Sequence, residues 1–175
     1  MPTISWLHLS DLHFGMKGQE WLWPSLRQEF YDDLSRVAES AGPWDAVIFS
    51  GDLTQKGTVD EFNKLSGVLD ELWKHLKSLG SEPLMLCVPG NHDLERPESH
   101  DPIVKALRQW HKDKEIRDVF WNNENNDYKR AIDKYFENYS NWLEKLPLPK
   151  PVDITKGFLP GDFSTHLAKG TAELV

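Results

Sequence analysis

The stretch PLMLCVPGNHDLERP, residues 83–97, decides the expected fold. Its first half is a short apolar run that is typical of a buried strand, and the run stops at Pro89. An amide, an imidazole and a carboxylate follow almost at once, in the consecutive residues Asn91, His92 and Asp93. Three polar groups directly after a buried strand indicate a ligand site on the loop that leaves the strand.

Two earlier stretches repeat this arrangement of a short apolar strand followed by a polar loop. Residues 4–9 and 45–50 are the apolar runs, and the loops after them read SDLHFG and SGDLT. The first loop carries Asp11 and His13, and the second carries Asp52. The carboxyl ends of parallel strands meet at one edge of a sheet, so we expect all three loops to converge there.

The segments between these strands have the apolar spacing of helices. Apolar side chains recur every three or four residues over residues 25–41 and again over residues 58–79. The first set is Leu26, Phe30, Leu34, Val37 and Ala41, and the second is Phe62, Leu65, Leu69, Leu72, Leu76 and Leu79. Potential capping boxes pair Ser25 with Gln28 and Thr58 with Glu61. The resulting βαβαβ order predicts an α/β fold with a parallel sheet and right-handed connections.

The chain after the third loop changes character. One helix is expected over residues 101–117 and a second over residues 128–146. We interpret the whole stretch 101–146 as a helical insertion, a cap over the site, and ordinary helices layered on the sheet are the alternative. The segment GFLPGDFSTHLAKG, residues 157–170, is expected to form a hairpin or two short strands around Pro160 and Gly161.

Length and composition set the broad class. The chain has 175 residues, 39% of them hydrophobic and 27% charged, which suits one globular domain. No apolar run approaches the roughly 20 residues of a membrane span, and the N-terminus does not have the pattern of a signal peptide. The single cysteine, Cys87, lies in an apolar run, so we expect a buried thiol and a cytoplasmic protein. A net charge of −8 weakly disfavours a broad nucleic-acid surface.

The polar residues of the three loops have the chemistry of a metal centre. Asp11 and His13 are two residues apart and can face the same side of an extended segment, where they hold one ion. The two oxygens of Asp52 can bridge a pair of ions, and Asn91 offers a neutral carbonyl oxygen to the second ion. Mixed oxygen and nitrogen ligands suit Mn, Fe, Zn or Ni.

His92 and Asp93 are the candidate catalytic residues. Because His92 follows Asn91 directly, it need not bind metal. Its imidazole can bond a phosphate oxygen or protonate a leaving group. We expect Asp93 to hold the ring of His92 in the required tautomer.

Three of the other histidines are assigned roles away from the metal centre. His8 lies within the first strand, on the face that it shares with Trp6, and is expected in the core. His75 lies on the polar side of the second helix and is expected to face solvent. His166, in the last strand-like stretch, is not assigned to the metal.

These loops resemble the first three motifs of the calcineurin-like metallophosphoesterases. The motifs are Asp11-x-His13, Gly51-Asp52 and Gly90-Asn91-His92-Asp93. The resemblance covers residues 4–93 and implies a four-layer αββα sandwich, of which the βαβαβ unit forms one sheet. It also implies two divalent ions, with manganese favoured, that activate a water for hydrolysis of phosphomonoesters or phosphodiesters.

The sequence departs from the family pattern in its second half. The family carries a later metal-binding histidine and a G-H-x-H motif, and neither is found up to Val175. We therefore expect residues 1–175 to be one metallophosphoesterase domain that is truncated at the C-terminus, with a missing segment or a partner chain completing the metal site.

Two alternatives stay open beside the phosphoesterase. The segment LHLSDLHFG also resembles the opening of double-strand-break repair nucleases, so a nucleic acid or a nucleotide is a possible substrate. A non-catalytic half-domain that a partner chain completes is the second alternative. The sequence does not distinguish the substrate, the metal or the oligomeric state.

Overall fold

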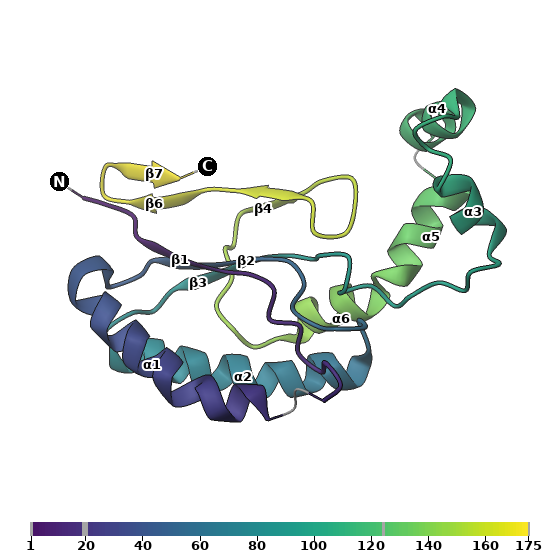
Figure 1. Cartoon of the computed structure of the whole chain (residues 1–175). Coiled ribbons are helices and arrows are strands. Elements are labelled where there is room, and N and C mark those ends of the chain that lie inside the picture. Colours follow the sequence, from purple (N-terminus) through teal and green to yellow (C-terminus); the bar gives the residue numbers. More distant parts are fainter. Residues whose placement is uncertain (1, 19–20, 124, 175) are drawn as a thin grey trace.

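The centre of the protein is a parallel three-stranded sheet (Figure 1). A computed structural model describes residues 2–18, 21–123 and 125–174. The strands lie in the order β1-β2-β3 and pair in parallel along their whole lengths. They are β1 (Trp6–Leu9), β2 (Ala46–Ser50) and β3 (Leu84–Val88). The expected α/β class and βαβαβ order are therefore confirmed.

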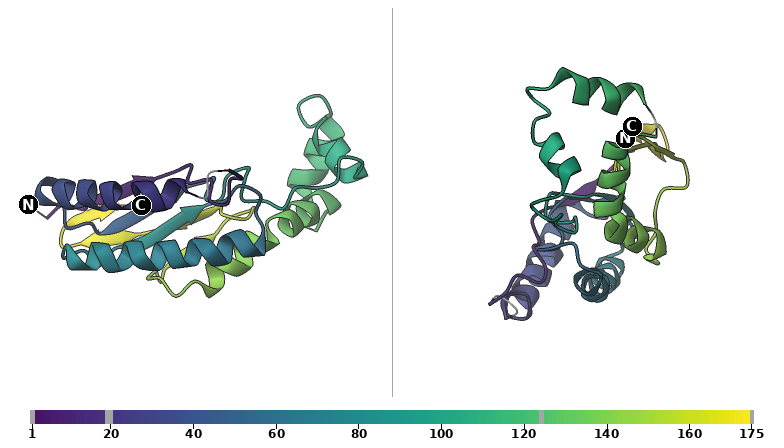
Figure 2. Two further views of the ribbon diagram at one scale, coloured as in Figure 1. Left: turned by 60° about the horizontal axis from the view of Figure 1, so that its bottom comes forward. Right: turned by 90° about the vertical axis from the view of Figure 1, so that its right-hand side faces the viewer.

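Helices α1 (Leu22–Ala41) and α2 (Val59–Ser78) make the two crossovers and lie on one side of the sheet (Figures 1 and 2). The expected capping box of α2 is present, since the Thr58 side chain accepts from the Glu61 N–H and the Glu61 side chain accepts from the Thr58 N–H. The expected apolar face is also the buried one, with Phe62, Leu65, Leu69, Leu72 and Leu76 inside.

Helix α1 differs from the expectation in both its start and its buried face. The helix begins three residues earlier, so Ser25 lies inside it and its hydroxyl donates to a carbonyl one turn back instead of capping the end. Leu34 is buried, whereas Leu26 and Val37, expected on the same face, are exposed. The side chains of α1 that join the core are Phe30, Tyr31, Leu34 and Ala38.

The core lies between the sheet and the helices, and the other face of the sheet is more open. Alternate residues of the central and third strands point into the core, namely Val47, Phe49, Met85 and Cys87. On the opposite face, Trp6 is 51% exposed. His8 lies beside it and is exposed too, with its Nε2 at 2.7 Å from the Ser50 hydroxyl. The core position expected for His8 is therefore wrong, because its strand face is not the one that the helices cover.

The stretch after β3 forms four helices where two were expected. They are α3 (Pro102–Leu107), α4 (Lys114–Asn122), α5 (Asp127–Tyr135) and α6 (Glu137–Lys145). Asp113 interrupts the first expected helix, because its side chain caps the N-terminus of α4. The second expected helix is divided at Phe136 into α5 and α6, and Asn126 caps the start of α5.

These four helices have two different positions. Helix α6 packs beside α2, where the Trp142 indole donates to the Ser66 hydroxyl at 2.9 Å. Helices α3, α4 and α5 project from the end of the sheet at which the loops after β1, β2 and β3 lie (Figures 1 and 2). We call residues 102–135 the helical arm.

Two short hairpins lie over the face of the sheet that α1 and α2 leave uncovered (Figure 1). One pairs β4 (Ile154–Lys156) with β5 (Phe163–Thr165), and the other pairs β6 (Leu167–Lys169) with β7 (Ala172–Leu174). The hairpin expected around residues 160–161 is confirmed. Among the described residues, no helix has both the length and the apolar character that a membrane crossing requires.

Candidate metal centre

The loops after β1 and β2 run side by side beyond the ends of their strands. The N–H of Asp11 donates to the carbonyl of Gly51 at 3.2 Å, and the N–H of His13 donates to the carbonyl of Asp52 at 2.9 Å. The two loops therefore continue the parallel pairing of their strands. This continuation brings side chains that are about forty positions apart in the sequence to one point.

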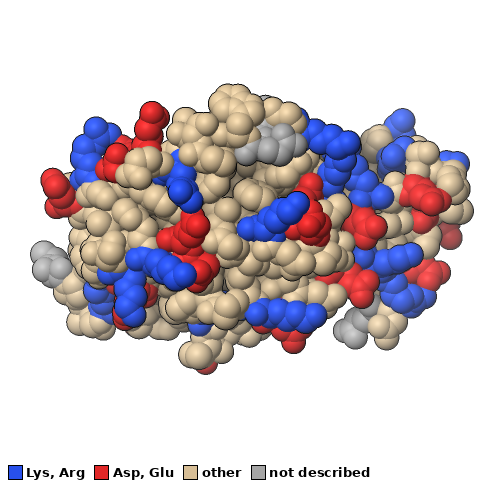
Figure 3. Space-filling model, turned by 90° about the horizontal axis from the view of Figure 1, so that it is seen from below, with Lys and Arg blue, Asp and Glu red and all other residues tan. Residues whose placement is uncertain are grey.

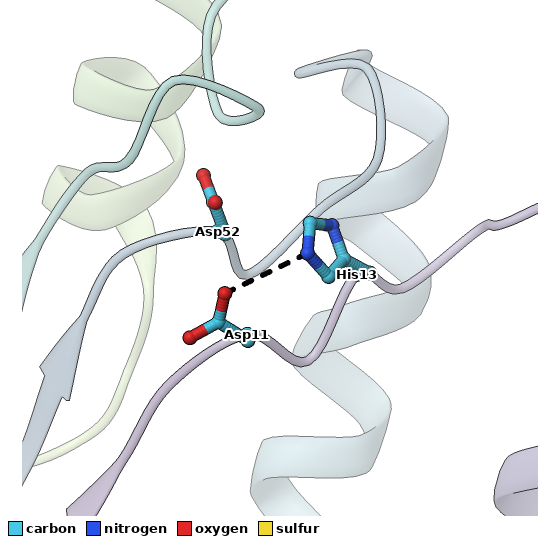
Figure 4. Close-up of side chains that lie close together, drawn as sticks. All are labelled: Asp11, His13 and Asp52. Atoms are coloured by element: carbon cyan, nitrogen blue, oxygen red, sulfur yellow. Dashed lines mark ion pairs between the residues drawn. The ribbon is translucent and has the colours of Figure 1, made fainter.

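Asp11, His13 and Asp52 form a group that can hold a metal ion (Figure 4). Each offers one ligand atom, and these atoms all lie within 4.8 Å of one another. The Nε2 of His13 is 3.7 Å from a carboxylate oxygen of Asp11. The other ring nitrogen of His13, Nδ1, is buried and has no hydrogen-bond partner among the described residues. Two carboxylates and an imidazole with a free nitrogen fit a divalent transition metal.

The backbone at these three residues is in an unusual conformation. Asp11, His13 and Asp52 have φ values of 56°, 43° and 53°, and they are the only non-glycine residues with positive φ in the described part of the chain. Each such residue costs about 1–3 kcal/mol, and the conformation persists only where the surrounding structure holds it. Strain that falls on all three members of the group indicates that the loops are built to aim these side chains.

The loop after β3 closes around Asp52. The N–H of His92 donates to Oδ1 of Asp52 at 2.9 Å. A Cβ at Gly90 would lie 2.1 Å from the same oxygen, so only glycine fits there. Asn91 lies between these two residues and is exposed. All three sequence-predicted loops therefore meet, and Asn91 stands on the loop segment that encloses the carboxylate of Asp52.

The imidazole of His92 lies against the metal group. Its ring meets that of His13 edge to face, with the centroids 4.7 Å apart. Its Nδ1 is 3.0 Å from the carbonyl oxygen of Gln55. Since a carbonyl only accepts, this contact assigns the proton of the neutral ring to Nδ1 and leaves Nε2 free.

Asp93 does not make the contact that was expected for it. Its side chain is fully buried, and both of its oxygens accept hydrogen bonds from other groups. The donors are the N–H groups of Leu53, Thr54 and Gly90 and the hydroxyl of Thr54, at 2.8 to 3.1 Å. Asp93 turns under the loop while His92 turns to its surface, so a main-chain carbonyl, not Asp93, bonds the imidazole.

Sequence reasoning missed Thr54 and Gln55. Both lie in GDLTQKG, only two and three residues after Asp52, and neither has a side chain that stands out as a ligand. Thr54 is fully buried, and the side-chain oxygen of Gln55 is buried without a hydrogen-bond partner in the described residues. Two uncharged polar residues beside a motif aspartate are the one signal that could have pointed to them.

Two other histidines lie away from the centre. His75 is half-buried and stacks on Tyr31 with ring centroids 4.6 Å apart, so its expected exposure to solvent is wrong. His166 is exposed, with its Nε2 3.6 Å from a carboxylate oxygen of Glu173.

The strand beneath the third loop is strongly apolar. Burial raises the pKa of the Cys87 thiol to about 12. Burial also raises the pKa of Tyr139, whose hydroxyl donates to the carbonyl of Cys87 at 2.9 Å. Both groups therefore stay neutral, and the carboxylates nearby are the charged groups of this region.

The fold and the site define an α/β domain with a candidate metal centre at the carboxyl edge of its sheet. The sequence profile of the calcineurin-like phosphoesterases matches residues 4–173. The chain therefore belongs to the calcineurin-like phosphoesterase family. A Bacillus subtilis (strain 168) protein, described as the uncharacterized metallophosphoesterase-like protein YydB, is 24% identical over 144 residues. The match covers 80% of this chain and 28% of that protein, so the chain spans less than a third of this relative.

Proposed function

We propose that this chain carries the metal-binding half of the active site of a phosphoesterase that hydrolyses phosphate esters with the help of two divalent ions. The observation that carries the proposal is the convergence of Asp11, His13 and Asp52 within 4.8 Å, with His92 packed against them. Family membership supports the reaction class.

Each loop contributes a different part of the proposed site. Asp11 and His13 would hold one ion, Asp52 would be shared between the two, and Asn91 would offer its carbonyl oxygen to the second. Oδ1 of Asp52 accepts the His92 N–H, which fixes the direction of the carboxylate. When bound, the two ions supply Lewis acidity that makes a water nucleophilic and neutralises phosphate charge.

His92 is the proposed acid. With the proton of the neutral ring on Nδ1, Nε2 is the nitrogen that can gain a second proton and pass it to a leaving-group oxygen. The same N–H of the protonated ring can donate to a phosphate oxygen. Its edge-to-face contact with His13 places it beside the residues that would hold the ions.

The chemistry of the ligands limits the choice of metal, and the surface charge bears on the choice of substrate. Mixed carboxylate, amide and imidazole ligands favour Mn, Fe, Zn or Ni, and we favour Mn. Phosphomonoesters and phosphodiesters, including nucleic acids, are the substrate classes. On the side formed by α1 and α2, Lys and Arg alternate with Asp and Glu (Figure 3), so that face does not offer a basic track for nucleic acid.

Calorimetric titration with Mn²⁺, followed by assays on a phosphomonoester and a phosphodiester, tests the proposal. The Asp52→Asn variant should weaken Mn²⁺ binding by more than about 10–100-fold, the range for residues that only orient a ligand. Asp70→Asn is the matched control, because Asp70 pairs with Lys74 on the exposed side of α2. Equal binding by both variants would show that Asp52 is not a ligand.

A further inference from the structure

We propose that Thr54 and Asp93 form a buried positioning pair that sets the tautomer of His92 through the carbonyl group of Gln55. The pair lies between the second and third loops, and the Thr54 hydroxyl also lies 3.3 Å from the carbonyl oxygen of His92. Its importance for catalysis rests on the proposed function, but the geometry that it imposes on His92 does not.

Asp93 is the anchor of the pair. Its carboxylate is fully buried and receives four donors, three of them main-chain N–H groups. Three donors belong to the second loop, namely the N–H groups of Leu53 and Thr54 and the Thr54 hydroxyl, and the fourth, the N–H of Gly90, belongs to its own loop. Hydrogen bonds to a charged acceptor in a buried site are strong, so the two loops are held as one unit.

Thr54 connects this anchor to the residues that follow it. Its hydroxyl donates to Oδ1 of Asp93 at 3.0 Å and accepts from the N–H of Gly57 at 3.1 Å. Its own N–H bonds the same carboxylate oxygen at 2.8 Å. The turn from Thr54 to Gly57 is thereby fixed at both ends, and the carbonyl of Gln55 lies within that turn.

The carbonyl of Gln55 is the group that acts on His92. It lies 3.0 Å from Nδ1 of the ring, and the N–H of Gln55 donates to the carbonyl of Phe14 at 3.0 Å. The residue is therefore tied to the first loop as well. A neutral carbonyl orients the ring without placing a further negative charge beside it, unlike the carboxylate that the sequence led us to expect.

The pattern of hydrogen-bond donors around Asp93 requires a carboxylate, so that even an isosteric amide should disrupt it. Oδ1 accepts from the N–H and the hydroxyl of Thr54, and Oδ2 accepts from the N–H groups of Leu53 and Gly90. In Asp93→Asn, the amide NH₂ would face two donors in either orientation of the side chain. The amide has the shape of the carboxylate, but it would therefore lose the hydrogen bonds that join the second and third loops.

Nitrogen-15 NMR of the imidazole, which distinguishes the two tautomers, tests the proposal in the metal-free chain at a pH where His92 is neutral. The unmodified chain should show the Nδ1–H form of His92. Thr54→Val, which replaces the hydroxyl with a methyl group of similar size, should give a mixture of tautomers, and Thr54→Ser should restore the single form. Thr58→Val is the control, because it removes a hydroxyl that caps α2 and should leave His92 unchanged.

Two results would overturn the proposal. One is a folded Thr54→Val chain whose His92 keeps a pure Nδ1–H form. The other is an Nε2–H form in the unmodified chain, a measurement that does not depend on whether any variant folds. Because neither readout needs metal or substrate, a chain that binds no Mn²⁺ but shows the expected tautomers would contradict the proposed function and leave this inference standing.

Discussion

The loops after β1, β2 and β3 leave the same end of the sheet as the helical arm, but they are held in a different way. The loops are joined by buried hydrogen bonds, above all the four that Asp93 accepts. Where the arm joins the body, the N–H of Glu95 donates to the carbonyl of Tyr135 at 2.8 Å. Just beyond the arm, the side chain of Asn138 donates to the carbonyl of Gly57 at 2.9 Å.

The arm is attached to the rest of the molecule by an aromatic cluster as well. Phe158, from the β4–β5 turn, packs against Phe120 and Trp121 of α4 with ring centroids 5.6 and 5.0 Å apart. The ammonium nitrogen of Lys129 lies 3.3 Å from the centroid of the Phe158 ring. Such contacts depend less on direction than the hydrogen bonds at Asp93, which weaken steeply when the donor angle becomes poor. The loops should therefore be rigid and the arm adjustable.

The largest expected effect concerns Cys87, directly beneath the third loop. Burial raises the pKa of its thiol from 9.0 to about 12, so its thiolate fraction at pH 8 should fall on the order of 1,000-fold below that of an unfolded chain. A disulfide exchange reagent should therefore label it only after denaturation. The unfolded chain loses this proton first, so the thiol contributes stability below pH 9 that is lost as the pH rises towards 12. Rapid labelling of the native chain would show that β3 opens beneath the third loop and exposes the Cys87 thiol to solvent.

A glycine substitution in the third loop should have the next largest effect. In Gly90→Ala the new Cβ would collide with the carboxylate of Asp52, and we expect Mn²⁺ affinity to fall about 10–100-fold in a titration. Gly67→Ala is the matched control, because a Cβ at that helical position meets nothing within 4 Å. The control should bind Mn²⁺ normally and gain about 0.5–1 kcal/mol in its free energy of unfolding. Unchanged Mn²⁺ binding by Gly90→Ala would mean that the loop yields as readily as the arm.

The smallest effect should come from the arm itself. Phe158→Ala removes the ring beneath Lys129, and a cation–π contact of this kind contributes about 0.5–2 kcal/mol. The same substitution removes the ring that packs on Phe120 and Trp121 of α4. Hydrogen exchange should therefore become faster in α4, roughly 10-fold, while the exchange of β3 and the Mn²⁺ affinity stay the same. Loss of Mn²⁺ binding would contradict the separation of arm and loops.

The same contrast explains what the sequence could predict. The strands and the order of the loops follow from short apolar runs, and the group of Asp11, His13 and Asp52 follows from parallel strands that end at one edge. Family motifs supported these assignments. The arm was harder, because Asp113 caps a new helix within the first expected one, and periodicity alone does not distinguish such a cap from an exposed polar residue.

The role of Asp93 shows a second limit. Adjacent residues in a tight loop point in different directions, so a carboxylate next to a histidine in the sequence need not contact it in space. The pairing of His92 with a carbonyl depends on a main-chain group of Gln55, which every residue possesses and no sequence pattern marks. The exposure of His8 likewise depends on which face of the sheet is covered, and the strand itself does not reveal that.

The most direct test of the account is the anomalous scattering of crystals of this chain grown with Mn²⁺. We predict a peak within bonding distance of Asp11, His13 and Asp52, and a weaker second peak towards Asn91. Peaks only at other carboxylates, or none near these three side chains at saturating Mn²⁺, would contradict the central claim that the three loops build a metal site.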